Sequence, residues 1–178
     1  RIVDKGHSRR FDVVLYVNGL PLVIVELKQA GTKQATVAKA HSQLGTYLHE
    51  FPLAFRTVVA TVVSDGLSAQ YGTPFTPLHH YSPWTVDEGG VPVETGPATT
   101  ELETLAYGLF APNRFLDVVT NFTAFDATKE GLVKRIAKPH QYFAVRKAVD
   151  STIRAVDSNG KAGVVWHTQG SGKSMEME

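Results

Sequence analysis

The feature that most constrains this chain is a pair of apolar, β-branched segments on either side of Asn18-Gly19, within residues 10–28. An Asn-Gly pair between two such segments is the strongest short-range signal for a β-hairpin, because both residues adopt the positive φ that a tight turn requires. The sequence therefore predicts two antiparallel strands joined at this turn.

The length of the loop decides which polar side chains share a face. A two-residue loop pairs Val17 with Leu20 and turns Asp12 away from Glu26. A three-residue loop places Asp12 opposite Glu26, because a shift of one residue moves every side chain to the other face. We predict the three-residue loop, since it would bring two carboxylates together for a cation. Lys28 follows Glu26 on the same face and would lie beside them.

The spacing of these charged residues is an aspartate, thirteen intervening residues and then Glu-x-Lys, which resembles the PD-(D/E)xK nuclease superfamily. The resemblance implies that Asp12 and Glu26 hold Mg²⁺ through oxygen ligands, as this ion prefers. It further implies that the metal acidifies a bound water and that Lys28 assists this water. The alternative is a solvated strand end with an ordinary Glu–Lys pair.

A helix is expected over residues 29–50, because apolar residues recur there at helical spacing and Phe51-Pro52 would end it. Gln43 and Tyr47 are four residues apart and hence neighbours on one face. The pair resembles the Gln-x-x-x-Tyr element of the RecB-like branch of these nucleases, which implies a place beside the active site. The alternative is an amide at the helix edge and a tyrosine in the core.

Two further strands are expected to complete this unit. Residues 55–64 are almost wholly apolar and predict a central strand, followed by a turn at Asp65. Residues 81–84 predict a last short strand. The unit would be a small mixed sheet with at least one flanking helix.

The segment after this unit changes in composition. Residues 87–100 are rich in Gly, Pro, Thr and Glu and predict a loop. Leucines at helical spacing predict a helix over residues 101–110, and Pro112 suits the first turn of a second helix that runs through Asn121.

The C-terminal part holds the most specific motif. A helix to about Val156 and a short buried strand over residues 163–167 precede a glycine-rich segment that ends in Gly-Lys-Ser. A strand before such a segment is typical of the phosphate-binding loop of P-loop NTPases, whose backbone N–H groups, lysine and hydroxyl bind phosphates and Mg²⁺. His167 stands where the first glycine usually lies, a departure that superfamily 2 helicases commonly show. The predicted nucleotide-binding residues are Thr168, Gln169, Gly170, Ser171, Gly172, Lys173 and Ser174.

Gln141 lies upstream of this loop and resembles the adenine-reading glutamine of the same helicases. A glutamine amide can pair with the amino group and N7 of adenine at once. We also expect the segment after Asn159 to be loosely held, because one strand and a P-loop without a parent sheet cannot bury their faces.

In this order, the motifs resemble the restriction (motor) subunit of type I restriction–modification enzymes. The implied fold is α/β: a PD-(D/E)xK domain over residues 1–98, a helical linker over 99–133 and the first strand and P-loop of a RecA-like domain over 134–178. The implied activity is Mg²⁺-dependent endonuclease cleavage of DNA, coupled in the full-length protein to ATP-driven translocation. The implied partners are double-stranded DNA and the methylation and specificity subunits, in the cytoplasm.

Composition excludes some kinds of binding site and some classes of protein. A formal net charge of +1 over 178 residues gives no global basic field, so any DNA contact must come from a local patch. The absence of cysteine excludes disulfides and cysteine-ligated zinc, and the absence of a long apolar run argues against a membrane span.

Two other functions stay open at this stage. One is a nuclease–helicase fusion of another repair or defence system, and the other is a catalytically dead DNA-binding scaffold. The chain opens at Arg1 and stops four residues after Ser174, so we expect a piece of a longer protein. This piece lacks the second helicase motif and is expected not to hydrolyse ATP.

Overall fold

The computed structural model describes residues 1–4, 6–29, 33–129 and 131–177. The strands are β1 (Ile2–Asp4), β2 (His7–Arg9), β3 (Val13–Val17), β4 (Leu20–Leu27), β5 (Ala60–Ser64), β6 (Ala69–Gly72), β7 (Thr123–Thr128) and β8 (Gly131–Ile136). The α-helices are α1 (Lys33–Glu50), α2 (Glu101–Tyr107), α3 (Pro112–Asn121), α4 (Pro139–Val156) and α5 (Lys173–Glu176), and two short 3₁₀ helices are η1 (Pro52–Phe55) and η2 (Leu78–His80).

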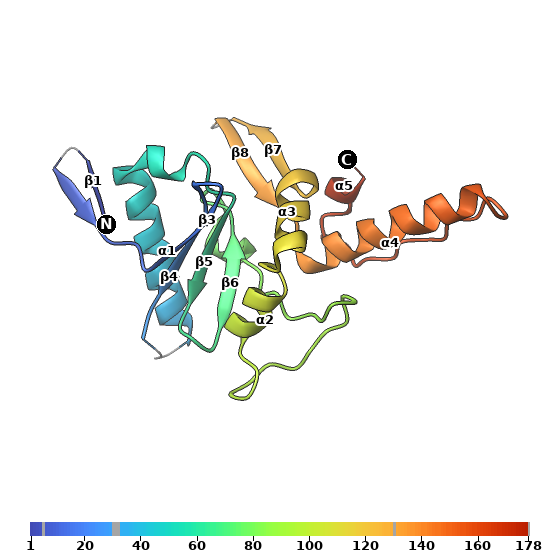
Figure 1. Cartoon of the computed structure of the whole chain (residues 1–178), viewed down its shortest axis with the longest axis horizontal. Helices are drawn as coiled ribbons and strands as arrows, with labels where there is room; N and C mark the ends of the chain where they lie inside the picture. The colour runs from blue at the N-terminus through green and yellow to red at the C-terminus, as the bar shows by residue number, and fades with distance from the viewer. Residues whose placement is uncertain (5, 30–32, 130, 178) are drawn as a thin grey trace.

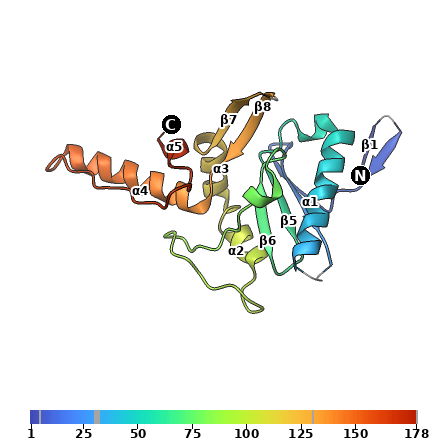
Figure 2. The ribbon, with the colours of Figure 1, turned by 180° about the vertical axis from the view of Figure 1, so that it is seen from behind.

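A four-stranded mixed sheet in the order β3-β4-β5-β6 forms the centre of the first half of the chain. Strands β4 and β5 are parallel, whereas the β3–β4 and β5–β6 pairs are antiparallel. Helix α1 covers one face of the sheet, and α2 and α3 lie on the other (Figures 1 and 2). Every residue of β5 is buried, so the central position predicted for this strand is confirmed.

The turn of the first large hairpin differs from the prediction. Val17 pairs with Leu20, so the loop is the two-residue Asn18-Gly19 and the three-residue loop is wrong. Asn18 has φ 49° and Gly19 has φ 81°. Positive φ at both positions gives a turn whose twist matches that of the flanking strands, which explains why the shorter loop is preferred.

The extra residue lies inside the strand instead. Leu15 pairs with Val23 while Tyr16 pairs with Pro21, which leaves an additional residue in β4. Such a β-bulge shifts the pairing register by one residue. Beyond the bulge, Val13 pairs with Val25. Continued by one residue, this register sets Asp12 opposite Glu26, the arrangement that the sequence predicted by a different route.

Two apolar cores lie on the two faces of the sheet. The core under α1 contains Ile24, Val37, Ala40, Leu44, Tyr47, Phe55, Val58, Val63 and Tyr81. The core on the opposite face includes Val25, Val62, Tyr71, Trp84, Leu105, Leu109, Phe115, Val118 and Tyr142. The second core joins residues from the sheet, from α2 and α3 and from the first turn of α4.

Several predicted boundaries are corrected. Helix α1 is described from Lys33, and Gln29 is not helical; residues 30–32 lie outside the described part. The strand expected over 55–64 begins only at Ala60, because Pro52–Phe55 forms a 3₁₀ helix. Residues 81–84 are not a strand: the last strand of the sheet is β6, to which Ser82 adds an isolated bridge with Tyr71.

The sequence did not predict the hairpin formed by β7 and β8. Strand β8 is bound to residues that flank strands of the central sheet. Thr73, just after β6, donates from Oγ1 to the Lys134 carbonyl at 2.8 Å, and Lys134 Nζ donates to the carbonyl of Val58, just before β5, at 2.6 Å. Just after β8, Tyr71 Oη donates to the Ala137 carbonyl at 2.8 Å. The segment predicted as a helical linker, residues 99–133, thus includes β7 and the first half of β8. The domain boundaries at 98/99 and 133/134 stay predictions.

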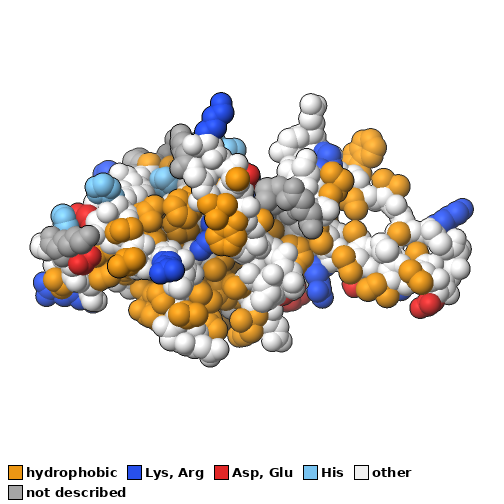
Figure 3. Space-filling view, turned by 90° about the horizontal axis from the view of Figure 1, so that it is seen from above, with side chains coloured by type: hydrophobic (Ala, Val, Ile, Leu, Met, Phe, Trp, Pro, Cys, Tyr) orange, Lys and Arg blue, Asp and Glu red, His pale blue; other side chains and the backbone are white. Residues whose placement is uncertain are grey.

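Helix α4 extends away from the sheet, and the chain returns beside it (Figures 1 and 2). The strand expected over residues 163–167 does not form, and the side chains of Val164 and Trp166 are each 89% exposed. No strand of the described residues lies beside this segment, so its backbone has no sheet partner. Figure 3 shows hydrophobic side chains at the surface of this part of the molecule. Within the described ranges, no helix is long and apolar enough to cross a membrane.

Candidate functional sites: a carboxylate cluster and a glycine-rich loop

Glu26 is the centre of the first site. Its side chain is buried in β4, and Lys28 Nζ donates a hydrogen bond to Oε1. The other oxygen, Oε2, is buried and has no hydrogen-bond partner among the residues that the structure describes. On the neighbouring segment, Asp12 Oδ2 accepts a hydrogen bond of 2.9 Å from the backbone N–H of Leu27. The structure therefore brings Asp12, Glu26 and Lys28 together at one end of the hairpin.

Burial raises the pKa of the Glu26 carboxyl, and the negative charge of Asp12 raises it further. The hydrogen bond and the positive charge of Lys28 act in the opposite direction. A buried carboxylate with one unpaired oxygen is costly unless a cation compensates it.

This donor set fits a divalent cation. Carboxylate oxygens are the ligands that Mg²⁺ prefers, and Glu26 Oε2 is an acceptor that no hydrogen bond from a described residue occupies. No group of three or more His, Cys, Asp or Glu side chains suited to a metal occurs among the residues described. Asp12 and Glu26 would then leave the other coordination positions to water and phosphate oxygens, which Mg²⁺ commonly keeps.

Gln43 and Tyr47 lie beside this cluster. Gln43 Nε2 donates a hydrogen bond to Tyr47 Oη, while the Tyr47 ring is buried and packs on Phe11 with centroids 5.2 Å apart. Both residues line a pocket of about 600 Å³ that is also lined by Lys28. The tyrosine ring thus belongs to the core, as the alternative held, and the pair also borders the site.

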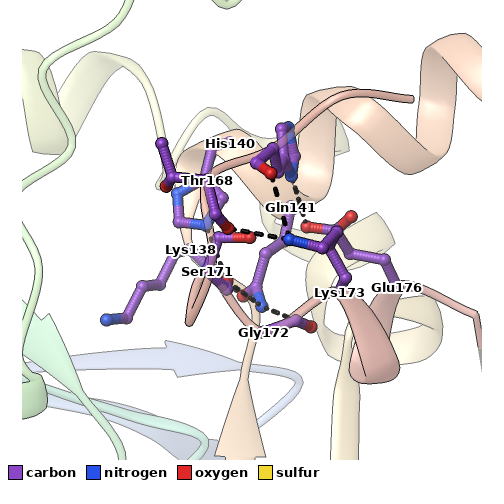
Figure 4. A network of polar contacts seen from close by, with 9 residues as sticks. Lys138, His140, Gln141, Thr168, Ser171, Gly172, Lys173 and Glu176 are labelled. Carbon is purple, nitrogen blue, oxygen red and sulfur yellow. Dashed lines mark hydrogen bonds and ion pairs between the residues drawn. The ribbon is translucent and has the colours of Figure 1, made fainter. Parts of the chain in front are cut away.

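The glycine-rich loop forms the second site (Figure 4). Lys173 Nζ donates to the carbonyls of His167 at 3.0 Å and Thr168 at 2.8 Å, and Ser171 N donates to the Thr168 carbonyl at 3.3 Å. Gly170 and Gly172 have φ of 79° and 88°, which a residue with a Cβ rarely adopts. The lysine ammonium is thereby folded over the loop that would hold a phosphate. The remaining predicted residues, Gln169 and Ser174, are exposed in the loop and in the first turn of α5.

Gln141 is brought to this loop from the first turn of α4. Its Nε2 donates to the carbonyls of Ser171 and Gly172, each at 3.3 Å, while its Oε1 accepts from Lys138 N at 2.8 Å (Figure 4). Both ends of the amide are therefore occupied by backbone groups. The neighbouring His140 makes a further contact with the Ser171 carbonyl at 3.0 Å.

Sequence reasoning missed residues at both sites. His140 at the loop, and Arg9 and Lys39 at the pocket, were not singled out. For His140 the only signal is its position next to Gln141. Lys39 is four residues before Gln43, so the helical spacing alone could have placed it on the same face.

Comparison with known proteins agrees with the order of the two sites. Over 177 residues the chain is 40% identical to the type I restriction enzyme HindI endonuclease subunit of Haemophilus influenzae, and the alignment covers 97% of this chain. The chain is a homologue of type I restriction enzyme endonuclease subunits. A subunit of this kind from Staphylococcus aureus is 26% identical over 176 residues, and one from Staphylococcus saprophyticus is 26% identical over 179 residues, each covering 97% of this chain.

Two family models match different parts of the chain. Residues 1–80 match the type I restriction enzyme R protein N terminus, and residues 140–178 match the SWI2/SNF2 ATPase family. The chain spans 17% of the length of each of these three relatives. The resemblance of the motifs to restriction endonuclease subunits is thus confirmed.

Proposed function

We propose that this chain carries the PD-(D/E)xK nuclease centre and the opening of the RecA-like motor of a type I restriction enzyme endonuclease subunit. The nuclease centre would hydrolyse phosphodiester bonds of double-stranded DNA with Mg²⁺. The observation that carries the proposal is the cluster of Asp12, buried Glu26 and Lys28, in which Glu26 keeps one oxygen unpaired.

Each residue of the cluster has a role that follows from its contacts. Asp12 and Glu26 would hold Mg²⁺, which when bound acidifies a water and offsets negative charge on the phosphate. Lys28 is held beside the site by Glu26 Oε1 and supplies a donor for the attacking water. Gln43 and Tyr47, joined by their own hydrogen bond, support the wall of the pocket next to Lys28.

The proposal extends to the larger assembly by analogy with the relatives. In the full-length protein, ATP bound at the glycine-rich loop would drive translocation on DNA, and methylation and specificity subunits would complete the enzyme in the cytoplasm. Lys173 and Ser174 would bind ATP and its Mg²⁺, and Gln141 would lie at the adenine side. The supporting observation is that hydrogen bonds to the Ser171 and Gly172 carbonyls hold Gln141 beside the loop; its amide would exchange these bonds for adenine when nucleotide binds.

Mg²⁺ binding measured by titration calorimetry tests the nuclease centre. Asp12→Asn keeps an oxygen that can accept from Leu27 N but removes the charge, so Mg²⁺ affinity is expected to fall at least about tenfold. Lys28→Met removes a cation that competes for Glu26, so affinity is expected to be kept or to rise. Asp126→Asn, at an exposed ion pair with Arg135 in the β7–β8 hairpin, is the matched control and should leave binding unchanged.

An absence of Mg²⁺ binding in the parent protein would contradict this centre and favour a catalytically dead scaffold. An Asp12→Asn variant that binds Mg²⁺ as tightly as the parent would also contradict this centre.

Nucleotide binding is tested separately with a fluorescent ATP analogue and Mg²⁺. Lys173→Ala is expected to weaken binding by about 10–100-fold, because a hydrogen bond to a charged group contributes about 1.5–3 kcal/mol. Lys161→Ala, an exposed lysine before the loop, is the control. Equal affinities of the two variants would argue against a phosphate site at Lys173.

A further inference from the structure

The pocket beside the carboxylate cluster is lined by cations from three different elements. Arg9 ends β2, Lys28 follows β4 and Lys39 lies on α1. The other lining residues are neutral and polar, and no acidic side chain of the described residues lines this space of about 600 Å³. A pocket of this composition fits an anionic ligand larger than one phosphate group.

Helix α1 presents a polar face to this pocket. Lys39, Ser42, Gln43 and Thr46 all line it, and their spacing of three or four residues places them on one side of the helix. The opposite side of the same helix is buried in the core. The helix is therefore held by its apolar side while its cation, hydroxyls and amide remain available to a ligand.

Arg9 is held in position at the end of this face. Its Nε donates to Glu50 Oε2 at 2.7 Å and its Nη2 donates to Glu50 Oε1 at 2.6 Å, a two-bond pairing that fixes the plane of the guanidinium. The Glu50 side chain is only 9% exposed, and its hydrogen bonds with Arg9 lower the pKa of this carboxyl, so it stays charged. Nη1 of Arg9 makes no hydrogen bond within the described part of the chain and keeps donors for a ligand.

Lys39 is the cation whose charge is not compensated. Arg9 is paired with Glu50 and Lys28 with Glu26, whereas Lys39 is exposed and forms no ion pair with any described residue. Such a charge beside neutral hydroxyl and amide groups attracts a phosphate more strongly than a lysine already paired with a carboxylate does.

Lys28 connects this pocket with the carboxylate cluster, because the same side chain lines the pocket and binds Glu26. We propose that the pocket seats the sugar–phosphate backbone of the DNA strand that enters the cluster. Lys39 is the main phosphate contact and Arg9, fixed by Glu50, is a second one. This inference rests on the proposed nuclease function and adds the surface that holds its substrate.

The test is binding of a fluorescently labelled DNA duplex, followed by anisotropy in EDTA so that no cleavage occurs, over a series of salt concentrations. Loss of one phosphate contact reduces the slope of log K against log salt by about 0.9. Lys39→Ala is therefore expected to reduce this slope by about one and to weaken binding about 5- to 10-fold at low salt. Lys161→Ala removes an exposed lysine outside this pocket and is the control for net charge.

The proposal is overturned if the parent does not bind duplex DNA, or if Lys39→Ala matches the parent in affinity and salt slope. It is also overturned if Lys161→Ala loses as much affinity as Lys39→Ala, because the effect would then be one of net charge alone. Mg²⁺ titration of Lys39→Ala should match the parent.

The two proposals fail in different ways. If DNA binding depends on Lys39 but Mg²⁺ does not bind, the DNA-binding pocket is supported and the nuclease centre is contradicted. If Mg²⁺ binding depends on Asp12 while Lys39→Ala binds DNA as the parent does, the nuclease centre is supported and the DNA-binding pocket is contradicted.

Discussion

Trp84→Ala is expected to lower the free energy of unfolding by about 3–5 kcal/mol, as truncation of a fully buried large side chain does. The Trp84 ring is completely buried, with its centroid about 6 Å from those of Tyr71, Tyr142 and Phe143. The guanidinium of Arg114 lies 5.7 Å from its centroid. Because Nε1 has no hydrogen-bond partner in the described part of the chain, the expected loss comes from packing between the sheet and α4.

The chain holds a matched control, because it contains two tryptophans. Trp166 is 89% exposed, so Trp166→Ala is expected to change the free energy of unfolding by less than about 0.5 kcal/mol. Urea unfolding followed by circular dichroism measures both. Similar losses for the two variants would contradict the arrangement in which Tyr142 and Phe143 of α4 close the core over Trp84.

Glu26→Gln is expected to stabilise the fold and to weaken Mg²⁺ binding. The neutral amide removes a buried charge with an unpaired oxygen, so the free energy of unfolding at neutral pH should rise by about 1 kcal/mol. Lys28 is partly exposed and can turn its ammonium to solvent when the carboxylate is gone. Mg²⁺ affinity should fall at least about tenfold in the same variant, since a charged ligand is lost.

The pH dependence of this stabilisation has a definite sign. The folded protein holds the Glu26 proton more tightly than the unfolded chain, because burial raises the pKa of this carboxyl. The stability of the parent therefore falls between the ordinary pKa of a glutamate, where the unfolded chain ionises, and the raised pKa, where folded Glu26 ionises as well. The advantage of Glu26→Gln should be smallest below the ordinary pKa of a glutamate, grow between that pKa and the raised one, and stay constant at higher pH.

Glu103→Gln is the control of opposite sign. The hydrogen bonds of the α2 capping box, from Thr100 N and Oγ1, lower the pKa of Glu103. Its ionised form stabilises the fold, so this substitution should lower stability at neutral pH and have little effect in acid. Thermal unfolding of the three proteins between acid and neutral pH measures the comparison. A constant difference between parent and Glu26→Gln across this range would contradict a buried, ionised Glu26.

Features set by neighbouring residues could be predicted from the sequence. The turn at Asn18-Gly19, the helical spacing of Gln43 and Tyr47, the central strand ending at Ser64 and the helix that follows Lys138 all depend on local patterns of φ preference and hydrophobic period. The order of motifs also indicated the family, because each motif can be recognised without knowing what lies beside it.

Features set by contacts between distant residues could not be predicted. The bulge near Leu22 allows the two-residue turn and the buried face of β4 to form together. It also sets Asp12 opposite Glu26, a pairing that the two-residue loop alone would exclude. The basic pocket requires Arg9, fixed by Glu50, to meet Lys39 across the end of α1.

The segment over residues 163–167 also shows that a local sequence pattern does not determine the tertiary structure. Its apolar, β-branched sequence favours a strand, yet the segment forms none, because no strand of the described residues lies beside it to pair with. Trp166 therefore remains exposed. A local pattern determines which conformation a segment prefers and which motif it carries. Only the tertiary structure decides which partners are in reach, because a strand, a buried charge and a binding pocket each exist through contacts with residues far away in the sequence.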